Sequence, residues 1–172
     1  MSYMIVNYWW HRHILYYKYY MTMESTENKV IVASRWRTPD GTLLESKHTH
    51  DYVSHTDTVS GEYYFVDGGT SYVRMSQNKV PMSNCCVYST DPIEAVRKYF
   101  RRGTFDKDGN RLWVLLKNLG DGHVQNIIRD IVNGGGNLTD PTAVQYVREL
   151  AYRFDCNDHV EEHDYMPADE EK

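Results

Sequence analysis

The chain has 172 residues, of which 41% are hydrophobic and 25% are charged, which is the composition of a globular protein with room for one domain. Its formal net charge of -5 is concentrated in residues 155–172, which carry eight Asp or Glu and one Lys, so the preceding 154 residues have a net charge of +2. A nearly neutral body lacks the broad basic surface that duplex binding requires, and this argues against a nucleic acid partner.

The chain contains no run of 18 apolar residues, and its aromatic beginning is interrupted by polar and basic residues. We therefore expect neither a membrane span nor a cleavable signal peptide. The three cysteines, Cys85, Cys86 and Cys156, cannot form a disulfide framework and contain no CxxC pair. These features predict a cytoplasmic protein without a membrane partner, and they leave homo-oligomerisation open.

Residues 1–23 contain eight aromatic side chains and no acidic one, unlike the rest of the chain. This segment reads as an appendage, which we delimit as an arm over residues 1–24. Two interpretations stay open. The arm is a docking element for a partner or subunit, or it results from the choice of start site, since Met21 and Met23 stand where ordinary composition resumes.

Residues 29–80 carry the signals of an antiparallel sheet. Short runs rich in β-branched and aromatic residues alternate with turns at Pro39-Asp40-Gly41, Ser60-Gly61 and Gly68-Gly69. We expect three to five short strands, with runs at Val30-Ile31-Val32, Thr42-Leu43-Leu44, Tyr52-Val53 and Tyr63-Tyr64-Phe65-Val66. Such a layer is stable only if another element covers one of its faces.

The first helix is predicted over residues 91–102, with Asp91 as N-cap and Glu94 closing a capping box. It is followed by a turn at Asp106-Lys107-Asp108-Gly109 and by the apolar run 112–116, which predicts a buried strand.

Asp121 is predicted to cap a second helix that ends at Asn133-Gly134, and Asp140-Pro141 to begin a third that ends near residue 154. The side chains expected to face the core are Ile93, Val96 and Phe100, then Val124, Ile127, Ile128, Ile131 and Val132, then Val144, Val147, Leu150, Ala151 and Phe154. The predicted fold class is α+β, with a small antiparallel β module packed against a C-terminal three-helix segment and one further strand. We divide the chain into the arm, a single domain over residues 25–154 (a β module at 25–80 and a mainly helical part at 85–154), and a flexible acidic tail at 155–172.

Three histidines and two aspartates fall within residues 47–57. One hypothesis is a metal-dependent phosphodiesterase or nuclease that uses His48, His50, Asp51, His55 and Asp57. The spacing matches neither H-x-H-x-D-H nor H-E-x-x-H, so a structural role in turns is the favoured interpretation. We assign no catalytic residue, no metal ligand and no cofactor.

A second hypothesis concerns a small anion-binding hollow. The backbone amides of Gly68 and Gly69, with Arg74 downstream and His50 nearby, are groups that can bind an anion. The residues we select as a ligand- or partner-binding surface are His50, Asp51, Asp67, Gly68, Gly69 and Arg74.

A basic run surrounds the end of the first predicted helix, where the helix dipole favours positive charge. Its members are Arg97, Lys98, Arg101, Arg102, Lys107 and Arg111. The alternatives are contacts with phosphate groups or with the acidic tail of the protein itself.

The order of motifs between Gly41 and Arg74 resembles a widespread family of uncharacterised proteins encoded by tailed bacteriophages. The motifs are Ser46-Lys47, His50-Asp51-Tyr52-Val53, Val66-Asp67-Gly68-Gly69 and Tyr72-Val73-Arg74, followed by Trp113-Val114-Leu115-Leu116-Lys117-Asn118-Leu119 and His123. Some members of that family carry four cysteines that look like a small zinc ribbon. The corresponding positions here are Arg37, Asp40, His55 and Asp57, and since arginine is not a zinc ligand, the resemblance implies a module held by hydrogen bonds and packing.

The resemblance, the compact size and the 15 tyrosines together favour a phage accessory protein of the host cytoplasm. It is expected to bind a host or defence component, either a protein or a small nucleotide signal, and to modulate it without catalysis. The alternatives are the metal-dependent phosphodiesterase or nuclease and a minor virion or assembly protein.

Overall fold

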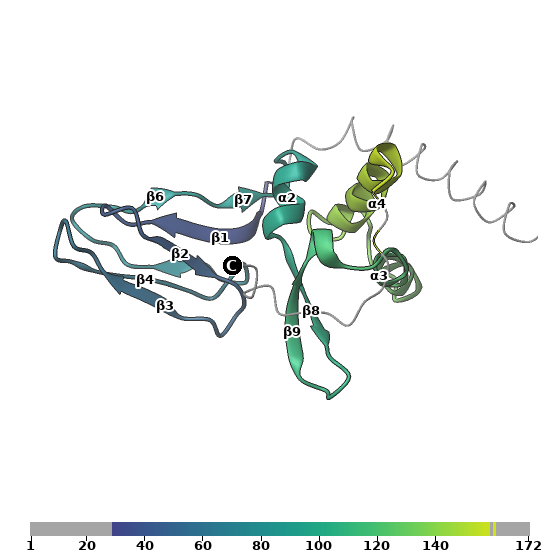
Figure 1. Ribbon diagram of the computed structural model, residues 1–172, viewed down its shortest axis with the longest axis horizontal. Helices are drawn as coiled ribbons and strands as arrows, with labels where there is room; N and C mark the ends of the chain where they lie inside the picture. The colour runs from purple at the N-terminus through teal and green to yellow at the C-terminus, as the bar shows by residue number, and fades with distance from the viewer. Residues whose placement is uncertain (1–28, 159, 161–172) are drawn as a thin grey trace, which may run out of the picture.

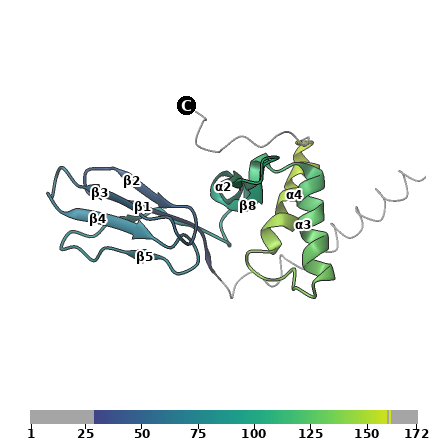
Figure 2. The same cartoon turned by 90° about the horizontal axis from the view of Figure 1, so that it is seen from below.

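The computed structural model describes residues 29–158 and 160, and within them most strands of an α+β fold gather at one end and the helices at the other (Figure 1). A view turned by 90° shows the same separation (Figure 2). The predicted fold class is confirmed. The predicted arm at 1–24 lies outside the described residues, as do residues 159 and 161–172 of the predicted tail.

Seven strands form what we call the β module. They are β1 (Ile31–Arg37), β2 (Leu43–Ser46), β3 (Val53–Thr56), β4 (Tyr63–Asp67), β5 (Arg74–Met75), β6 (Ser83–Asn84) and β7 (Val87–Tyr88). The remaining elements form what we call the helical body. They are α2 (Ile93–Tyr99), β8 (Arg101–Phe105), β9 (Arg111–Leu115), the short 3-10 helix η1 (Leu116–Asn118), α3 (Asp121–Asn133) and α4 (Val144–Cys156).

The β module consists of two antiparallel sheets. In one sheet β1 lies between β2 and β6 and also pairs with β7, and in the other β4 lies between β3 and β5. The inner faces of the two sheets meet in a small core that contains Trp36, Leu44, Tyr64 and Val66. The predicted strand runs and turns are therefore present, and β6 and β7 extend the module beyond its predicted end at residue 80.

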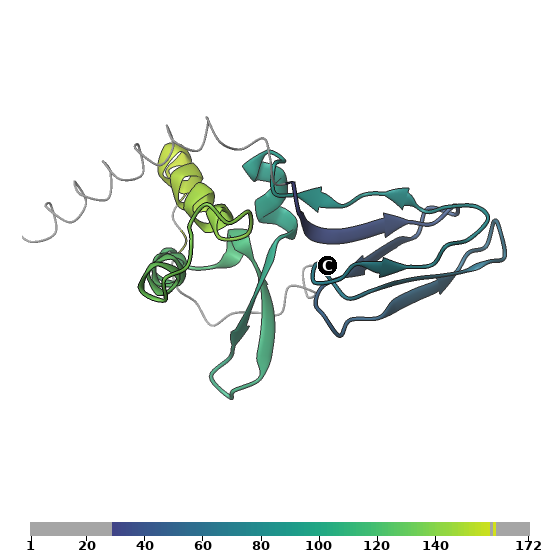
Figure 3. The same ribbon diagram turned by 180° about the vertical axis from the view of Figure 1, so that it is seen from behind.

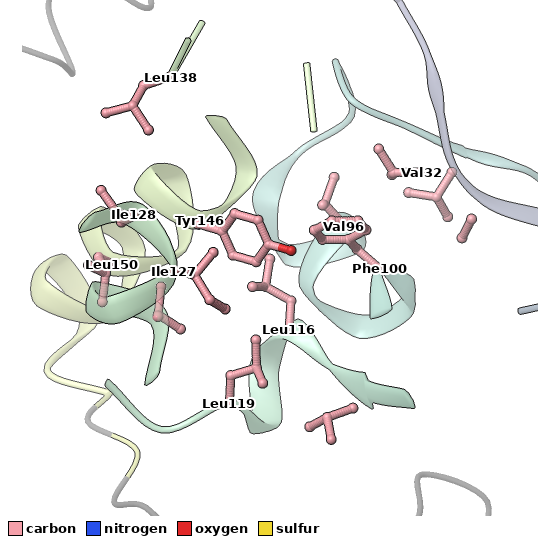
Figure 4. Close-up of a cluster of buried hydrophobic side chains, with 14 residues drawn as sticks. Val32, Val96, Phe100, Leu116, Leu119, Ile127, Ile128, Leu138, Tyr146 and Leu150 are labelled. Carbon is pink, nitrogen blue, oxygen red and sulfur yellow. The ribbon is translucent and has the colours of Figure 1, made fainter. Parts of the chain in front are cut away.

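A larger core lies among the helices (Figure 4). The rings of Phe100 and Tyr146 pack with their centroids 5.6 Å apart, which joins α4 to the end of α2. Strand β1 takes part in both cores, because Val32 and Ala33 belong to the larger one and Trp36 to the smaller one. Strand β1 therefore links the two parts of the molecule, and Val87 of β7 also belongs to the larger core.

The first helix is shorter than predicted, because α2 ends at Tyr99 and the two arginines after Phe100 lie in strand β8. Strand β8 pairs with β9 over their full length, and the hairpin projects away from the helices (Figures 1 and 3). The turn at 106–110 closes this hairpin, since Asp106 accepts hydrogen bonds from the amides that follow it. The predicted single strand thus has a partner made from residues assigned to a helix end.

The predicted caps of α2 and α3 are wrong. Asp91 does not cap α2, and its carboxylate accepts the backbone N–H of Tyr88 instead. Asp121 is the first residue of α3, and Gly120 occupies the N-cap position. Along α3, Val124, Ile127 and Ile128 are buried as predicted and Ile131 packs against the core, but Val132 is exposed.

Helix α4 buries polar side chains beside the apolar ones that were predicted. Leu150 is buried and Val147 packs against the core as expected. The buried residues are Gln145, Tyr146, Glu149, Leu150 and Arg153, whereas Phe154 is exposed. Arg153 Nε donates to Glu149 Oε1 at 2.7 Å, and Arg97 Nη2 donates to the same carboxylate oxygen at 2.8 Å. The other acceptors of Arg153 are the carbonyls of Leu116, Lys117 and Leu119 and the carboxylate of Asp121.

The start of the predicted acidic tail belongs to the helical body. Helix α4 continues to Cys156, two residues beyond the predicted end of the domain, and Asn157 ends it in a left-handed conformation. Asp158 then pairs with Arg97 at 2.9 Å. No helix among the described residues is long and apolar enough to cross a membrane.

Candidate functional site

Two turns of the β module are joined at a corner made by Asp40, His55 and Asp57. Asp40 Oδ2 lies 2.8 Å from His55 Nε2, and the Asp40 backbone N–H donates to Asp57 Oδ2 at 2.7 Å. Arg37 Nη1 donates to the Gly41 carbonyl in the same turn. Asp40, His55 and Asp57 are thus brought together by hydrogen bonds, and Arg37 bonds the adjoining turn.

The two carboxylates of this corner are stabilised in their ionised form. The hydrogen bond to His55, followed by those from Thr58, Thr38 and Thr42, holds the pKa of Asp40 well below its ordinary value. Burial alone would raise the pKa of Asp57, but the bonds it accepts from Ser60 and from the Asp40 amide lower it. A carboxylate that accepts several amide bonds organises a turn, which fits the structural interpretation of these residues.

Asp51 holds the loop between β2 and β3. Its Oδ2 accepts the Lys47 backbone N–H at 2.7 Å, and its carbonyl accepts the Ser46 hydroxyl at 2.7 Å. Ser46 Oγ in turn accepts the Gly69 backbone N–H at 2.7 Å. Asp51 and Gly69, which lie far apart in the sequence, are therefore linked through one buried serine.

Gly68 and Gly69 form a turn that only glycine fits. Both have positive φ, and a Cβ on Gly69 would meet the backbone of His48 at 2.7 Å. A Cβ on Gly68 would meet the ring of Tyr72 at 2.4 Å. The glycines thus allow this turn to pack directly against the β2–β3 loop.

The anion-binding groups of the predicted hollow are engaged within the protein. Arg74 Nη2 donates to Asp67 Oδ2 at 2.6 Å, and the Tyr72 hydroxyl donates to Asp67 Oδ1 at 3.3 Å. The Gly69 amide is used by Ser46. Of the six selected residues, Asp67 and Arg74 pair directly, while His50 is exposed and donates its backbone N–H to His48 Nδ1.

The residues of the metal hypothesis lie in separate places. The ring of His48 stacks on Trp113 with centroids 5.0 Å apart, Asp51 bonds its own loop, and His55 and Asp57 belong to the corner with Asp40. Within residues 29–158 and 160, no group of three or more His, Cys, Asp or Glu could hold a metal ion.

An aromatic surface lies on the outer face of the β3–β4–β5 sheet. We call it the aromatic face and define it by Tyr52, Tyr63, Phe65 and Arg74, of which Arg74 alone was a predicted site residue. Tyr52 stacks on Phe65 with centroids 5.4 Å apart, and the Arg74 guanidinium lies 5.8 Å from the Phe65 ring centroid. The Tyr52 and Tyr63 hydroxyls are 3.3 Å apart, and this bond raises the pKa of Tyr52. The pKa of Tyr63 is lowered, first by a bond to Ser54 and then by the bond to Tyr52.

The signal for this face was present in the sequence. Residues alternate between buried and outward along β4, so Tyr64 and Val66 fill the small core while Tyr63 and Phe65 point outward. Outward positions of a sheet with one solvated face are usually polar. Two aromatic residues at such positions indicate a surface with a binding role.

Comparison of the chain with protein-family models, with curated proteins and with solved structures finds no match in any of the three.

Proposed function

We propose that the protein is a phage accessory protein that binds a host or defence component in the host cytoplasm and modulates it without catalysis. The observation that carries this proposal is the aromatic face. Its two tyrosines are about half exposed, at 49% for Tyr52 and 52% for Tyr63, although both rings are fixed by contacts within the protein.

A rigid aromatic surface suits a binding partner for a physical reason. Tyrosine offers a large contact area at a low cost in conformational entropy, and its hydroxyl provides a hydrogen bond at the rim of the contact. Stacking of Tyr52 on Phe65 and pairing of Arg74 with Asp67 orient these side chains before any partner arrives. Preorganisation of this kind strengthens binding, because less freedom is lost on association.

The composition of the face favours a protein as the partner. Tyrosine, phenylalanine and arginine are the residues enriched at the centres of protein interfaces. The neighbouring Tyr72, which is 53% exposed and bonded to Thr49, extends the same surface toward the β2–β3 loop. A small nucleotide signal is the alternative ligand.

The proposal is tested by site-specific photocrosslinking in bacterial cells. A photoreactive phenylalanine analogue replaces Tyr63 in one variant and the exposed Val132 of α3 in a matched control. We expect one host protein to be captured from position 63 and not from position 132. The captured protein is then purified, and its affinity for the wild type is compared with that for Phe65→Ser.

Loss of a central aromatic anchor costs about 2 kcal/mol or more of binding free energy, so Phe65→Ser should weaken binding at least tenfold. The comparison requires that the variant retains the circular dichroism spectrum of the wild type. Equal capture from both positions, or unchanged affinity in a folded Phe65→Ser variant, would contradict the proposal. Retention of a nucleotide by the purified protein, released by the same substitution, would identify the alternative ligand.

A further inference from the structure

Three charged residues meet where the β module contacts the helical body. Glu45 on β2 lies opposite Arg35 on β1 in the sheet register, and Arg101 on β8 reaches the same carboxylate. Arg101 Nη2 donates to Glu45 Oε1 at 3.0 Å. The Arg35 guanidinium lies 3.7 Å from the ring centroid of Tyr99, at the end of α2. We call this group the seam triad.

The seam triad contains more donors than acceptors. Within the part of the chain that the structure describes, Arg101 Nε, Arg101 Nη1 and Arg35 Nε are buried and have no hydrogen-bond partner. Arg35 Nε lies 3.4 Å from Glu45 Oε2, an ion-pair distance without hydrogen-bond geometry. Two guanidinium groups against one carboxylate leave a charge of +1 in side chains that are only 15% and 11% exposed.

Burying these unpaired donors costs free energy unless further acceptors bind them. A buried donor without an acceptor costs about 1–3 kcal/mol, and more when the donor is charged. A buried arginine is normally satisfied by several acceptors, because it has five N–H groups in a fixed geometry. The unpaired donors of the seam triad therefore point to an anionic ligand.

The surroundings of the seam triad add positive and aromatic groups. Trp113 lies opposite Gly103 in the β8–β9 register, so Trp113 and Arg101 are on the same face of the hairpin. The Arg111 guanidinium lies 4.8 Å from the Trp113 ring centroid, and His48 stacks on the same ring. This face therefore presents further cationic and aromatic side chains beside the two arginines.

We propose that Arg35 and Arg101 form a binding site for a phosphate monoester group, in which Glu45 acts as an internal competitor. A phosphate monoester has three terminal oxygens and carries nearly two negative charges at neutral pH. It therefore offers more acceptors and more negative charge than the Glu45 carboxylate, whose two oxygens leave donors of both arginines unpaired. The site is distinct from the aromatic face and does not depend on the proposed function.

The site is tested by NMR of the arginine Nε–H groups in the full chain during titration with inorganic phosphate, with chloride at matched ionic strength as the reference. We expect the Arg35 and Arg101 resonances to shift in a saturable way with phosphate only. Titration with adenosine monophosphate and with adenosine separates the sources. A tighter response to the nucleotide than to inorganic phosphate identifies a phosphorylated small molecule, and adenosine alone should give no response.

Four variants make the test specific. Arg101→Gln should abolish the response. If the glutamine variant does not fold, Arg101→Lys, which keeps the charge but lacks the planar fork, should weaken the response. Arg129→Gln, which removes an exposed arginine from α3, should leave it unchanged. Glu45→Gln should tighten phosphate binding by about tenfold or more, because a negative charge within about 4 Å of the ligand is removed.

Failure of phosphate and adenosine monophosphate to shift either resonance would overturn the proposal. The same holds for an equal response in wild type and Arg101→Gln, or for weaker binding by Glu45→Gln. The last result would mean that Glu45 helps to build the site and does not compete with the ligand.

Discussion

The described part of the molecule contains two Arg-Glu-Arg groups, and they differ in how completely their donors are used. In the helical body, Glu149 lies between Arg97 and Arg153, which also donate to Asp158, Asp121 and backbone carbonyls. In the seam triad, Arg101 donates to Glu45, and three donor nitrogens have no acceptor among the described residues. With Asp158 and Asp121 counted, the first group is closed and carries a charge of -1, whereas the three residues of the second are open and carry +1.

This difference separates a structural network from a binding site. A buried ion pair stabilises a fold only when hydrogen bonds satisfy the remaining donors and acceptors of its members. The helical-body group meets that condition, with Glu149 fully buried and Arg153 only 1% exposed. The seam triad does not meet it, and incomplete polar groups of this kind cluster at functional sites.

The largest expected effect comes from breaking the closed group. Arg153→Met removes the partner of a buried carboxylate and the donor to three backbone carbonyls, and it should lower the free energy of unfolding by about 3–5 kcal/mol. Urea unfolding followed by circular dichroism measures this change. Arg129→Met on the exposed side of α3 is the matched control and should change stability by less than about 0.5 kcal/mol.

The next largest loss of stability is expected in the β module, where the turn at Gly69 lies against the backbone of His48 in the β2–β3 loop. Gly69→Ala places a methyl group 2.7 Å from the His48 backbone at a residue with φ of +55°, and we expect a loss of about 2–4 kcal/mol. Gly61→Ala, which has a similar φ of +71° but open space, should cost about 1 kcal/mol. Equal losses of unfolding free energy in the two alanine variants would show that the close contact between Gly69 and His48 does not affect stability.

A smaller effect is expected when the open group is changed. Arg101→Met removes donors that have no acceptor and leaves Glu45 paired with Arg35, so stability should change by less than about 1.5 kcal/mol. The same urea experiment applies. A loss as large as that of Arg153→Met would mean that the two groups play the same structural part, and the comparison would fail.

The smallest effect is expected as a dependence on pH at the corner of the β module. The pKa of Asp40 is lowered in the folded protein, chiefly by His55, so ionised Asp40 stabilises the fold above its unfolded pKa. This contribution is lost as the pH falls toward the lower folded pKa. The stability difference between wild type and Asp40→Asn should therefore be smaller at about pH 3 than at about pH 5. A difference that grows on acidification would contradict the assignment.

Local signals in the sequence were sufficient for much of the fold. Turn residues and short apolar runs located the first four strands, and the apolar spacing of Val124, Ile127 and Ile128 located the buried side of α3. The errors arose where pairing between distant segments overrides local preference. Arg101 and Arg102 suit a helix end, but they lie in β8 because residues 111–115 supply a strand for them.

The buried side of α4 could be predicted only in part, for a related reason. Hydrophobic periodicity correctly selects Val147 and Leu150. It does not select Glu149 and Arg153, which are stable inside only because Arg97 and the η1 carbonyls complete their bonds. Arg97, the partner of Glu149, lies 52 residues away in the sequence, so the sequence of α4 alone does not reveal this ion pair.

Single residues of the candidate sites could be named from the sequence, but their groupings could not. The fold joins the loops that carry Asp51 and Gly69, and the groups of these loops bond mainly to each other. Arg74 and Arg101 were named, but the aromatic face and the seam triad were not, since each depends on which strands are neighbours and on which face a residue points.

The participation of β1 in both hydrophobic cores has a consequence for how the protein melts. Removal of the strand would strip Trp36 from one core and Val32 and Ala33 from the other at the same time. Neither half can then keep its interior while the other comes apart, so the described chain is one cooperative folding unit, with a single heat-absorption peak in calorimetry.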